Sequence, residues 1–429
     1  MWKYSPMAPV NPKSPETLPL PPSFSAFYGL CAVGFLARTS YALARTPVLA
    51  LFAASLGAGP EAIGFCVAIS TITGIFFKMP AGVVADVLGK TRTLFMGLAC
   101  FAFVPFAYLL VSTYHGLVVV RFFHGFATAI YGPVAMAVVV QVAGNRRGEM
   151  LSWFSSVTIL GNLLGAPLGG FLLTRLSAGA FPRLTDFHLI YGVVAACGLA
   201  SLFLALWVLR RQPREPAGPQ GRTLAAVLTQ FKTGVREILM DRRVFLTSNM
   251  EGVQNLSLGA LEAFLPIYAV QMAHLSAFQA GMLWGVQMVT TIASKPIMGR
   301  FSDRYGRQPL LFWGMWVCAL PFALIPWFDN FAVLLSLAAL FGLGEAVVTS
   351  SAAALVADYC REDHLGSAMG TFGTIFDIGH ATGPLLAGGL IGLWGGLDYR
   401  APFAIIAGLL IIMALVFKAR GTGEKSEVA

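Results

Sequence analysis

Charged side chains are scarce in this sequence. Asp, Glu, Lys and Arg together make up 11% of the 429 residues, whereas hydrophobic residues make up 57% and the mean hydropathy is +0.73. A water-soluble domain carries charge on about a quarter of its residues. So few charges cannot cover a surface that faces water. The composition therefore predicts a chain whose main partner is a lipid bilayer.

Cysteines are also few and scattered. The six occur at positions 31, 66, 100, 197, 318 and 360, with no C-x-x-C pair and no spacing typical of zinc ligands. Disulfide frameworks and zinc sites are recognised by cysteines at short, regular spacings. The sequence thus predicts neither a disulfide framework nor a metal site.

Motifs that bind nucleotides or carry catalytic groups are missing as well. The chain has no G-x-x-x-x-G-K-[ST] loop, no G-x-S-x-G and no H-E-x-x-H. The first motif cradles the phosphates of ATP, and the other two hold a serine nucleophile or a zinc ion. We therefore expect no enzyme, no ATP-driven pump and no cofactor. Transport would draw on an ion gradient, with protons as the default and sodium as the alternative.

Long apolar segments, by contrast, are abundant. A helix that crosses the hydrocarbon core needs about 20 mostly apolar residues. Twelve segments qualify: 25–54, 61–84, 93–112, 116–141, 150–174, 188–209, 244–270, 277–299, 308–327, 331–357, 367–391 and 399–418. The longest contain internal polar residues, which is typical of tilted or broken helices. The expected fold is an all-α membrane protein with twelve transmembrane helices.

The distribution of Lys and Arg predicts the orientation. Most of the 29 lie in the two tails, the central linker and the loops on that side, and only Arg175, Arg183 and Arg400 fall in loops on the other side. Cytoplasmic loops carry the excess of Lys and Arg. Both termini are therefore expected in the cytoplasm. The net charge of +9 then marks topology rather than a nucleic-acid partner, and a bacterial inner membrane fits these features.

A basic segment separates six spans from six. The expected parts are a cytoplasmic tail (1–24), an N-terminal six-helix bundle (25–209), a cytoplasmic linker (210–243), a C-terminal six-helix bundle (244–418) and a second cytoplasmic tail (419–429). Within the linker, LAAVLTQFKTGVREIL places apolar residues at helical spacing, which predicts a helix on the membrane surface.

The two halves carry the same polar loop, GVVADVLGKTR (82–92) and GRFSDRYGRQP (299–309). At an offset of 217 residues, Gly82, Asp86, Gly89 and Lys90 align with Gly299, Asp303, Gly306 and Arg307. Lys78 and Lys295 align at the same offset. An internal repeat in a membrane protein predicts two pseudo-symmetric bundles with a binding site between them.

The second loop contains the pattern G-x-x-x-D-R-x-G-R, formed by Gly299, Asp303, Arg304, Gly306 and Arg307. This pattern, together with the arrangement of six spans, a basic linker and six more spans, resembles the major facilitator superfamily. The first loop departs from the pattern at Val87, which leaves Asp86, Lys90 and Arg92 to carry its charge. The resemblance implies a secondary transporter whose two bundles rock around a central cavity. Contacts made by the two loops would hold the transporter in one conformation, as a latch. The alternative is that the same residues simply form a tight polar turn at the cytoplasmic side.

Two further stretches resemble patterns in this family. RFFHG places Arg121 and Gly125 where the family often has residues implicated in proton coupling. GNLLGAPLGG (161–170) is similar to the glycine-proline stretch of the efflux branches, although Ala166 occupies the usual proline position and Pro167 comes one residue late. Its small residues and their counterparts in the second half also predict close helix packing. The set is Gly161, Gly165, Pro167, Gly169, Gly170, Gly379, Gly383 and Pro384.

Ionisable residues inside the expected spans are the candidate substrate and coupling residues. Each costs about 3 kcal/mol at mid-membrane, so it is expected to face a cavity or a partner. The selected residues are Arg38, Tyr41, Arg121, Glu262, Glu345 and Asp377. We expect the acids to carry protons or to form ion pairs with basic residues. Weaker candidates are Glu251, His124, His380, Lys78 and Lys295, the last two suggesting a structural task that both halves share.

The expected function is export of a small solute by proton antiport, carried out by a monomer. The basic residues in the spans favour an alternative, uptake of an organic anion or a metal chelate by symport. A third alternative, of another class, is a transporter-shaped receptor or scaffold that no longer cycles.

Overall fold

The computed structural model describes residues 24–143, 146–177, 182–210, 229, 241–360, 365–395 and 398–421. The two tails and nearly all of the linker, with its expected surface helix, lie outside the described residues. Helices cover every one of the twelve expected spans. Nine of these segments are long and apolar enough to cross a membrane among the residues described; the other three contain α1, α10 and α13.

The N-terminal half contains α1 (Phe24–Leu43), α2 (Val48–Ser55), α3 (Pro60–Leu88), α4 (Lys90–Ala107), α5 (Tyr114–Val142), α6 (Arg147–Leu176) and α7 (Leu184–Leu209). The C-terminal half contains α9 (Arg242–Ile267), α10 (Ala277–Tyr305), α11 (Arg307–Leu324), α12 (Phe331–Tyr359), α13 (Leu365–Leu393) and α14 (Arg400–Gly421). A short π-helical segment, Tyr268–Met272, follows α9.

The first expected span is two helices rather than one. α1 ends at Leu43 and α2 begins at Val48, so residues 44–47 form a turn inside the span. Pro47 lies in this turn, and its ring removes a backbone donor from the helical hydrogen-bond ladder. The turn places the polar residues Arg45 and Thr46 outside a continuous helix, where both reach Glu262 of α9.

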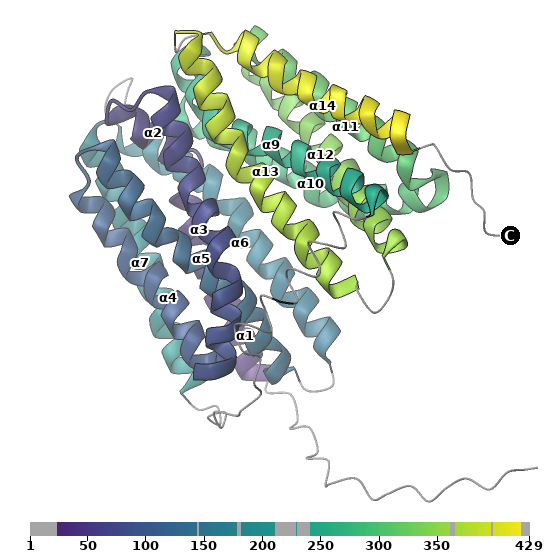
Figure 1. The fold of residues 1–429 in the computed structure, drawn as a ribbon. Coiled ribbons are helices and arrows are strands. Elements are labelled where there is room, and N and C mark those ends of the chain that lie inside the picture. The colour runs from purple at the N-terminus through teal and green to yellow at the C-terminus, as the bar shows by residue number, and fades with distance from the viewer. Residues whose placement is uncertain are drawn as a thin grey trace, which may run out of the picture.

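The two halves repeat one packing scheme. In the N-terminal bundle the pairs α1–α6, α3–α5 and α4–α7 pack closely, and their counterparts α9–α13, α10–α12 and α11–α14 do so in the C-terminal bundle. Across the bundles, α3 packs on α13 and α6 packs on α10. Figure 1 shows the bundles side by side, with the long α13 crossing between them.

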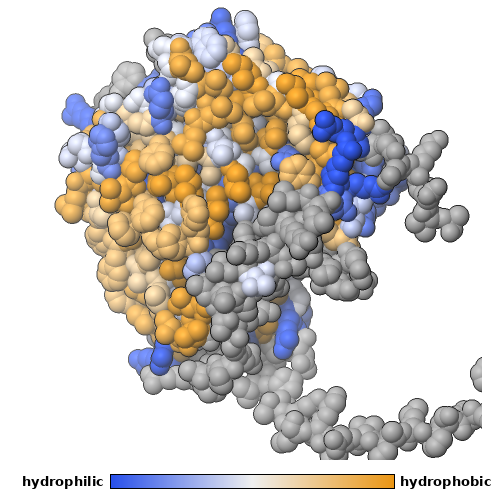
Figure 2. Space-filling view, in the orientation of Figure 1, coloured by the Kyte–Doolittle hydropathy of each residue, from blue (hydrophilic) through white to orange (hydrophobic). Residues whose placement is uncertain are grey.

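The outer surface matches a lipid environment. Large apolar side chains such as Phe76, Phe203, Trp207 and Trp313 are more than half exposed. Figure 2 shows a broad hydrophobic face with hydrophilic residues gathered towards its edges. Contiguous apolar surface of this extent on a soluble protein would lead to association. In a bilayer it is the expected outer face.

Each bundle has two ends, which we name by the linker. The linker end carries Gly89, Gly306 and the residues that flank the linker; the distal end carries the α2–α3 and α13–α14 connections. At the distal end the bundles touch backbone to backbone. Gly64 of α3 lies against the carbonyl of Pro384, and Gly388 of α13 lies against the carbonyl of Pro60. Gly170 of α6 approaches Ala277 of α10 in the same way.

The linker end is more open. A Cβ atom added at Gly82, Gly299, Gly370 or Gly373 would meet no heavy atom within 4 Å. Gly82 lies on α3 and Gly370 and Gly373 on α13, the two helices that touch at their distal ends. The helix axes also diverge towards the lower part of Figure 1. Among the described residues, the bundles are therefore in contact at the distal end and separated at the linker end (Figure 1).

Two adjacent glycines of α13 provide a matched test of distal closure. A Cβ at Gly388 would lie 2.5 Å from the Pro60 carbonyl oxygen, whereas a Cβ at Gly389 would meet nothing within 4 Å. Gly388→Ala should separate α3 from α13 and destabilise the closed form by about 1–3 kcal/mol, the usual cost of overpacking. Gly389→Ala should gain the same helix propensity without the clash. Thermal unfolding in detergent, with the two variants compared directly, measures the difference; equal stability would contradict the packing argument.

Candidate functional site

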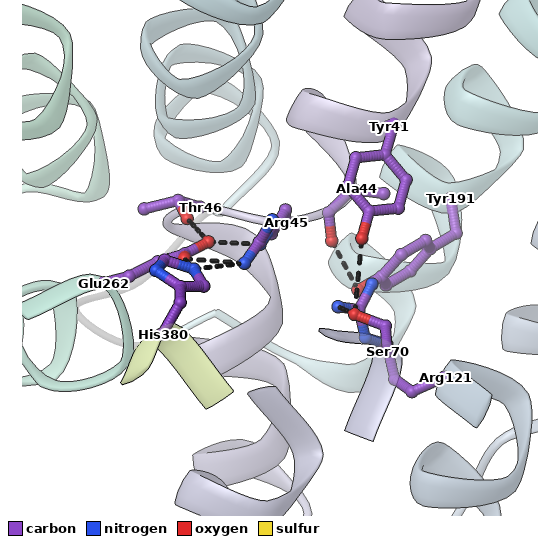
Figure 3. A network of polar contacts seen from close by, with 9 residues as sticks. All are labelled: Tyr41, Ala44, Arg45, Thr46, Ser70, Arg121, Tyr191, Glu262 and His380. Carbon is purple, nitrogen blue, oxygen red and sulfur yellow. Dashed lines mark hydrogen bonds and ion pairs between the residues drawn. The ribbon is translucent and has the colours of Figure 1, made fainter. Parts of the chain in front are cut away.

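The α1–α2 turn reaches across the bundle interface to α9. Arg45 forms an ion pair with Glu262, and its Nη2 also donates to Glu262 Oε2 at 2.8 Å. The Thr46 hydroxyl donates to Glu262 Oε1 at 3.0 Å. The Glu262 side chain is 4% exposed and that of Arg45 22%. The carboxylate is thus held by two groups from the other bundle, as Figure 3 shows.

His380 of α13 completes this cluster. Its Nε2 lies 2.9 Å from Arg45 Nη2 and 2.9 Å from Glu262 Oε2. A ring nitrogen either carries a proton and donates or lacks one and accepts. When Nε2 carries the proton it can bind Glu262 but faces Arg45 with like polarity; when it lacks the proton it can accept from Arg45. We call Arg45, Thr46, Glu262 and His380 the distal bridge.

A second network lies deeper in the N-terminal bundle. Arg121 of α5 is fully buried, and its Nη2 donates to the Ser70 hydroxyl at 2.5 Å. Ser70 is 3.3 Å from the hydroxyl of Tyr41. The Nε and Nη1 atoms of Arg121 have no hydrogen-bond partner among the described residues. A buried cation with unused donors is energetically costly, so the protein retains Arg121 against a folding penalty.

Tyr41 connects the two networks. The guanidinium carbons of Arg45 and Arg121 each lie 5.8 Å from the centre of its ring. This geometry is suitable for a cation–π interaction on either side. The hydroxyl of Tyr191, on α7, donates at 3.2 Å to the carbonyl of Ala44, the residue before Arg45 (Figure 3). The α1–α2 turn is therefore held by side chains that also surround Arg121.

A second ion pair also crosses the interface. Lys78 of α3 pairs with Asp377 of α13. Lys78 is 46% exposed and Asp377 17%, so this ion pair is more exposed to solvent than the Arg45–Glu262 pair. We expected Asp377 either to carry a proton or to pair with a basic residue. The structure contains the ion pair.

The remaining acids lie inside the C-terminal bundle. Glu345 Oε2 accepts from Thr291 at 3.1 Å and also from Gln287. Glu251 is fully buried, and its Oε1 accepts from Asn255 at 3.3 Å. Its second oxygen has no hydrogen-bond partner among the described residues. In the part of the chain that the structure describes, neither acid forms an ion pair or hydrogen bond with the N-terminal bundle.

The candidate latch loops share one backbone conformation. Gly89 and Gly306 have φ of 91° and 94°, which only glycine adopts readily, and each separates two helices. Arg307 pairs with Asp303 and Asp358 and donates to the Ala354 carbonyl at 2.6 Å, all within the C-terminal bundle. Asp303, Gly306, Arg307 and Asp358 line a recess of about 410 Å³. The side chain of Asp86 lies outside the described residues.

The packing glycines lie where helices meet. Gly161 and Gly165 of α6 contact α1, and Gly379 and Gly383 of α13 contact α9. Gly170 and Pro167 contact α10 across the interface. The same glycine pattern therefore lies at equivalent helix pairs in the two bundles.

The sequence analysis missed Arg45, which is the partner of Glu262. A signal was present, because Arg45 lies 217 residues before Glu262, the offset that relates the two polar loops. Arg38, which was selected, forms no ion pair or hydrogen bond among the described residues. The structure also brings His380 to Glu262, although His380 was a weaker candidate. Among the described residues, no group of three His, Cys, Asp or Glu side chains could hold a metal ion.

Among the candidate residues of the spans, charge is divided between the two bundles, and two ion pairs join them, Arg45–Glu262 and Lys78–Asp377. The N-terminal bundle presents the cations, and the C-terminal bundle presents the acids. The cations are Arg38, Arg45, Lys78 and Arg121, and the acids are Glu251, Glu262, Glu345 and Asp377. Lys295 of α10 is the exception. Such complementarity attracts the two faces to one another.

Comparison with known proteins agrees with this architecture. An uncharacterized MFS-type transporter from Methanocaldococcus jannaschii is 23% identical over 391 residues, covering 90% of this chain and 95% of that protein. The multidrug resistance protein MdtG from Escherichia coli is 23% identical over 282 residues, covering 65% of this chain and 64% of MdtG. The MFS-type transporter ppzB from Metarhizium rileyi is 26% identical over 408 residues, with 80% and 83% covered.

Solved structures share the fold. The crystal structure of the nucleoside transporter NupG superposes with a TM-score of 0.77 at 16% identity, covering 93% of this chain and all of NupG. A crystal structure of the peptide transporter POT gives a TM-score of 0.70 at 15% identity. The family model described as Major Facilitator Superfamily matches residues 30–289 and again 252–428. With both halves matched and the same two-bundle packing in the structure, the chain belongs to the Major Facilitator Superfamily of membrane transporters.

Proposed function

We propose that the protein exports a small solute in exchange for protons, with the distal bridge as the coupling site. The observation that carries this proposal is that one nearly buried carboxylate, Glu262, holds an arginine from the other bundle and a histidine at the closed end. The names of MdtG and of PmrA, a multi-drug resistance efflux pump from Streptococcus pneumoniae that is 28% identical over 163 residues, favour export.

The linker end faces the cytoplasm in this proposal. The excess of Lys and Arg near the linker supports this orientation. The open end of the structure would then receive solute from the cytoplasm, and the distal end would face the outside. One chain supplies both sides of the bridge, so a monomer contains the whole coupling site.

The distal bridge would couple protons to movement through Arg45. While Glu262 is ionised, its pairing with Arg45 keeps the distal end closed. When the bundles separate there, Glu262 loses the cation that favours its ionised form and can take a proton from outside. Closing the distal end brings Arg45 back, and the proton passes to the open side with His380 as the adjacent acceptor. Solute binding would favour distal opening, as the exchange of one ligand for another requires.

The strength of the bridge can be measured by a double-mutant cycle. Arg45→Gln and Glu262→Gln should each destabilise the protein, since each leaves a nearly buried charge without its partner. The double variant should be less destabilised than the sum, with a coupling energy of about 2 kcal/mol. Unfolding by SDS in mixed micelles gives the four values.

The Arg146–Glu149 pair serves as the matched control. It also joins an arginine to a glutamate, but both side chains are 49% exposed. Exposed pairs contribute at most about 1 kcal/mol, so its cycle should give a clearly smaller coupling. Equal coupling in the two cycles would contradict a bridging role for Glu262.

The conformational consequence can be measured without knowing the solute. Spin labels at Ser55 and Asp329 report the distal end, and labels at Ser152 and Met369 report the linker end, in a background from which the six native cysteines are removed. Lowering the pH should lengthen the distal distance, because protonating Glu262 or His380 weakens the hold on Arg45. Glu262→Gln should be open at the distal end more often and respond less to pH. An unchanged pH response in Glu262→Gln would place proton coupling elsewhere.

Transport itself is tested in proteoliposomes that hold a pH difference and an internal pH indicator. Ethidium, a lipophilic cation, and 2-naphthoate, an aromatic anion, serve as trial solutes. The solute that is carried should discharge the pH difference in wild-type vesicles and fail to do so with Glu262→Gln, while solute exchange without a pH difference persists. Undiminished proton movement in Glu262→Gln would contradict antiport through this residue.

A further inference from the structure

A separate recess lies within the N-terminal bundle, between α1, α5 and α6. Its volume is about 350 Å³, near the lower limit of small-molecule sites. Arg38 lines it from α1, Tyr131, Pro133 and Met136 from α5, and Phe154 and Thr158 from α6. The distal bridge does not contribute to its wall.

Unlike Arg45 and Lys78, Arg38 has no acidic partner among the described residues, and unlike Arg121 it donates no hydrogen bond there. Arg45 and Lys78 pair with acids of the other bundle, and Arg121 donates to Ser70. Arg38 has only the ring of Tyr131, 5.9 Å from its guanidinium carbon. Because an uncompensated arginine in a membrane interior is costly, its retention favours an anionic partner that comes from outside the chain.

The surroundings of Arg38 keep it accessible. A Cβ on Gly132 would already lie 3.7 Å from Arg38 Nη2, so a larger side chain at 132 would fill the space beside the guanidinium. No acidic residue lines the recess. The remaining wall is mostly aromatic and apolar, which favours a hydrocarbon or aromatic body over a small inorganic anion.

Comparison of the two halves argues against a purely structural role. Features that packing requires recur in both bundles, as the polar loops, the glycine pattern and the Lys78–Lys295 pair do. The residue 217 positions after Arg38 is Asn255, which is neutral. The fold therefore does not demand a cation at this place in a bundle.

We propose that this recess binds the transported solute and that the solute is an organic anion, with its carboxylate or equivalent group on Arg38 and an apolar body against Tyr131 and Phe154. This inference rests on the proposed transport function, because it takes the occupant of the recess to be the cargo. Bidentate pairing between guanidinium and carboxylate supplies the recognition.

Equilibrium binding tests the site independently of transport. The probe is 2-naphthoate, titrated calorimetrically into purified protein in neutral detergent, with the neutral 2-naphthamide and the cation 2-naphthylmethylammonium as comparison ligands. Wild-type protein should bind the anion saturably with a Kd below 1 mM, and at least tenfold more tightly than either comparison ligand. Absence of saturable binding, or equal affinity for the three ligands, would overturn the proposal.

Three variants locate the binding. Arg38→Gln should weaken anion binding at least tenfold, and Arg38→Lys should restore part of it. Gly132→Leu keeps the charge but fills the recess, and should also weaken binding at least tenfold. Arg147→Gln removes an exposed cation from the same bundle and should leave the Kd unchanged. Undiminished binding in either Arg38→Gln or a folded Gly132→Leu would overturn the assignment.

Two further experiments separate anion binding from proton coupling and a soluble anion from a lipid headgroup. Glu262→Gln should still bind 2-naphthoate, so a failed coupling experiment would leave the site intact, and a failed binding experiment would leave the coupling proposal intact. Titration in nanodiscs of phosphatidylcholine, with and without phosphatidylglycerol, distinguishes a soluble anion from a lipid headgroup. Binding that is unaffected by phosphatidylglycerol supports a cargo site, and loss of binding would assign the recess to lipid and overturn it.

Discussion

The contact between Arg45 and Glu262 joins the two halves of the molecule at the end where they are closed. An arginine and a carboxylate of opposite bundles cannot separate without one of them losing its partner in a poorly hydrated interior. Glycine makes the contact possible, since Gly64 and Gly388 allow the backbones of α3 and α13 to meet on the same side of the interface. The distal closure therefore combines close packing, which is insensitive to protonation, with an ion pair, which is sensitive to it.

The hydrocarbon environment of the bilayer explains why several of the few ionised residues of the spans are placed near groups of opposite charge. Inside a hydrocarbon environment each ionised group needs a partner or a water-filled space. Placing cations on one bundle and acids on the other gives Arg45, Lys78, Glu262 and Asp377 a charged partner only when the bundles meet. Charge separation between the bundles thus favours the closed arrangement, in which the opposite charges meet. Lys78 is 46% exposed whereas Glu262 is 4% exposed, so the two ion pairs between the bundles differ in hydration.

Most of the fold but only part of the candidate site could be predicted from the sequence. Span length and hydropathy located all twelve segments, because every transmembrane helix must cross a hydrocarbon layer of the same thickness. The repeated loops predicted two similar bundles, and the equivalent helix pairs confirm them. Partner identity could not be predicted, because Glu262 and Arg45 meet only through the packing of two bundles. Arg45 was not selected, although the length and internal polar residues of the first span indicated a tilted or broken helix; the break at 44–47 places Arg45 in a turn from which it reaches Glu262 of α9.

That break also makes the two related halves unequal. α1 is interrupted before Pro47, whereas α9 continues through the equivalent stretch and changes only later, at the π-helical segment Tyr268–Met272. An interrupted helix can change direction by adjusting a few backbone dihedral angles, while a continuous helix moves as a rod.

The α1–α2 turn is bonded to Tyr191 through the Ala44 carbonyl, and its Arg45 faces the ring of Tyr41. A displacement of Arg45 would consequently alter the surroundings of Tyr41 and, through it, of Arg121. Arg121, two of whose nitrogens lack a hydrogen-bond partner among the described residues, is thus separated from the distal bridge by the Tyr41 ring alone.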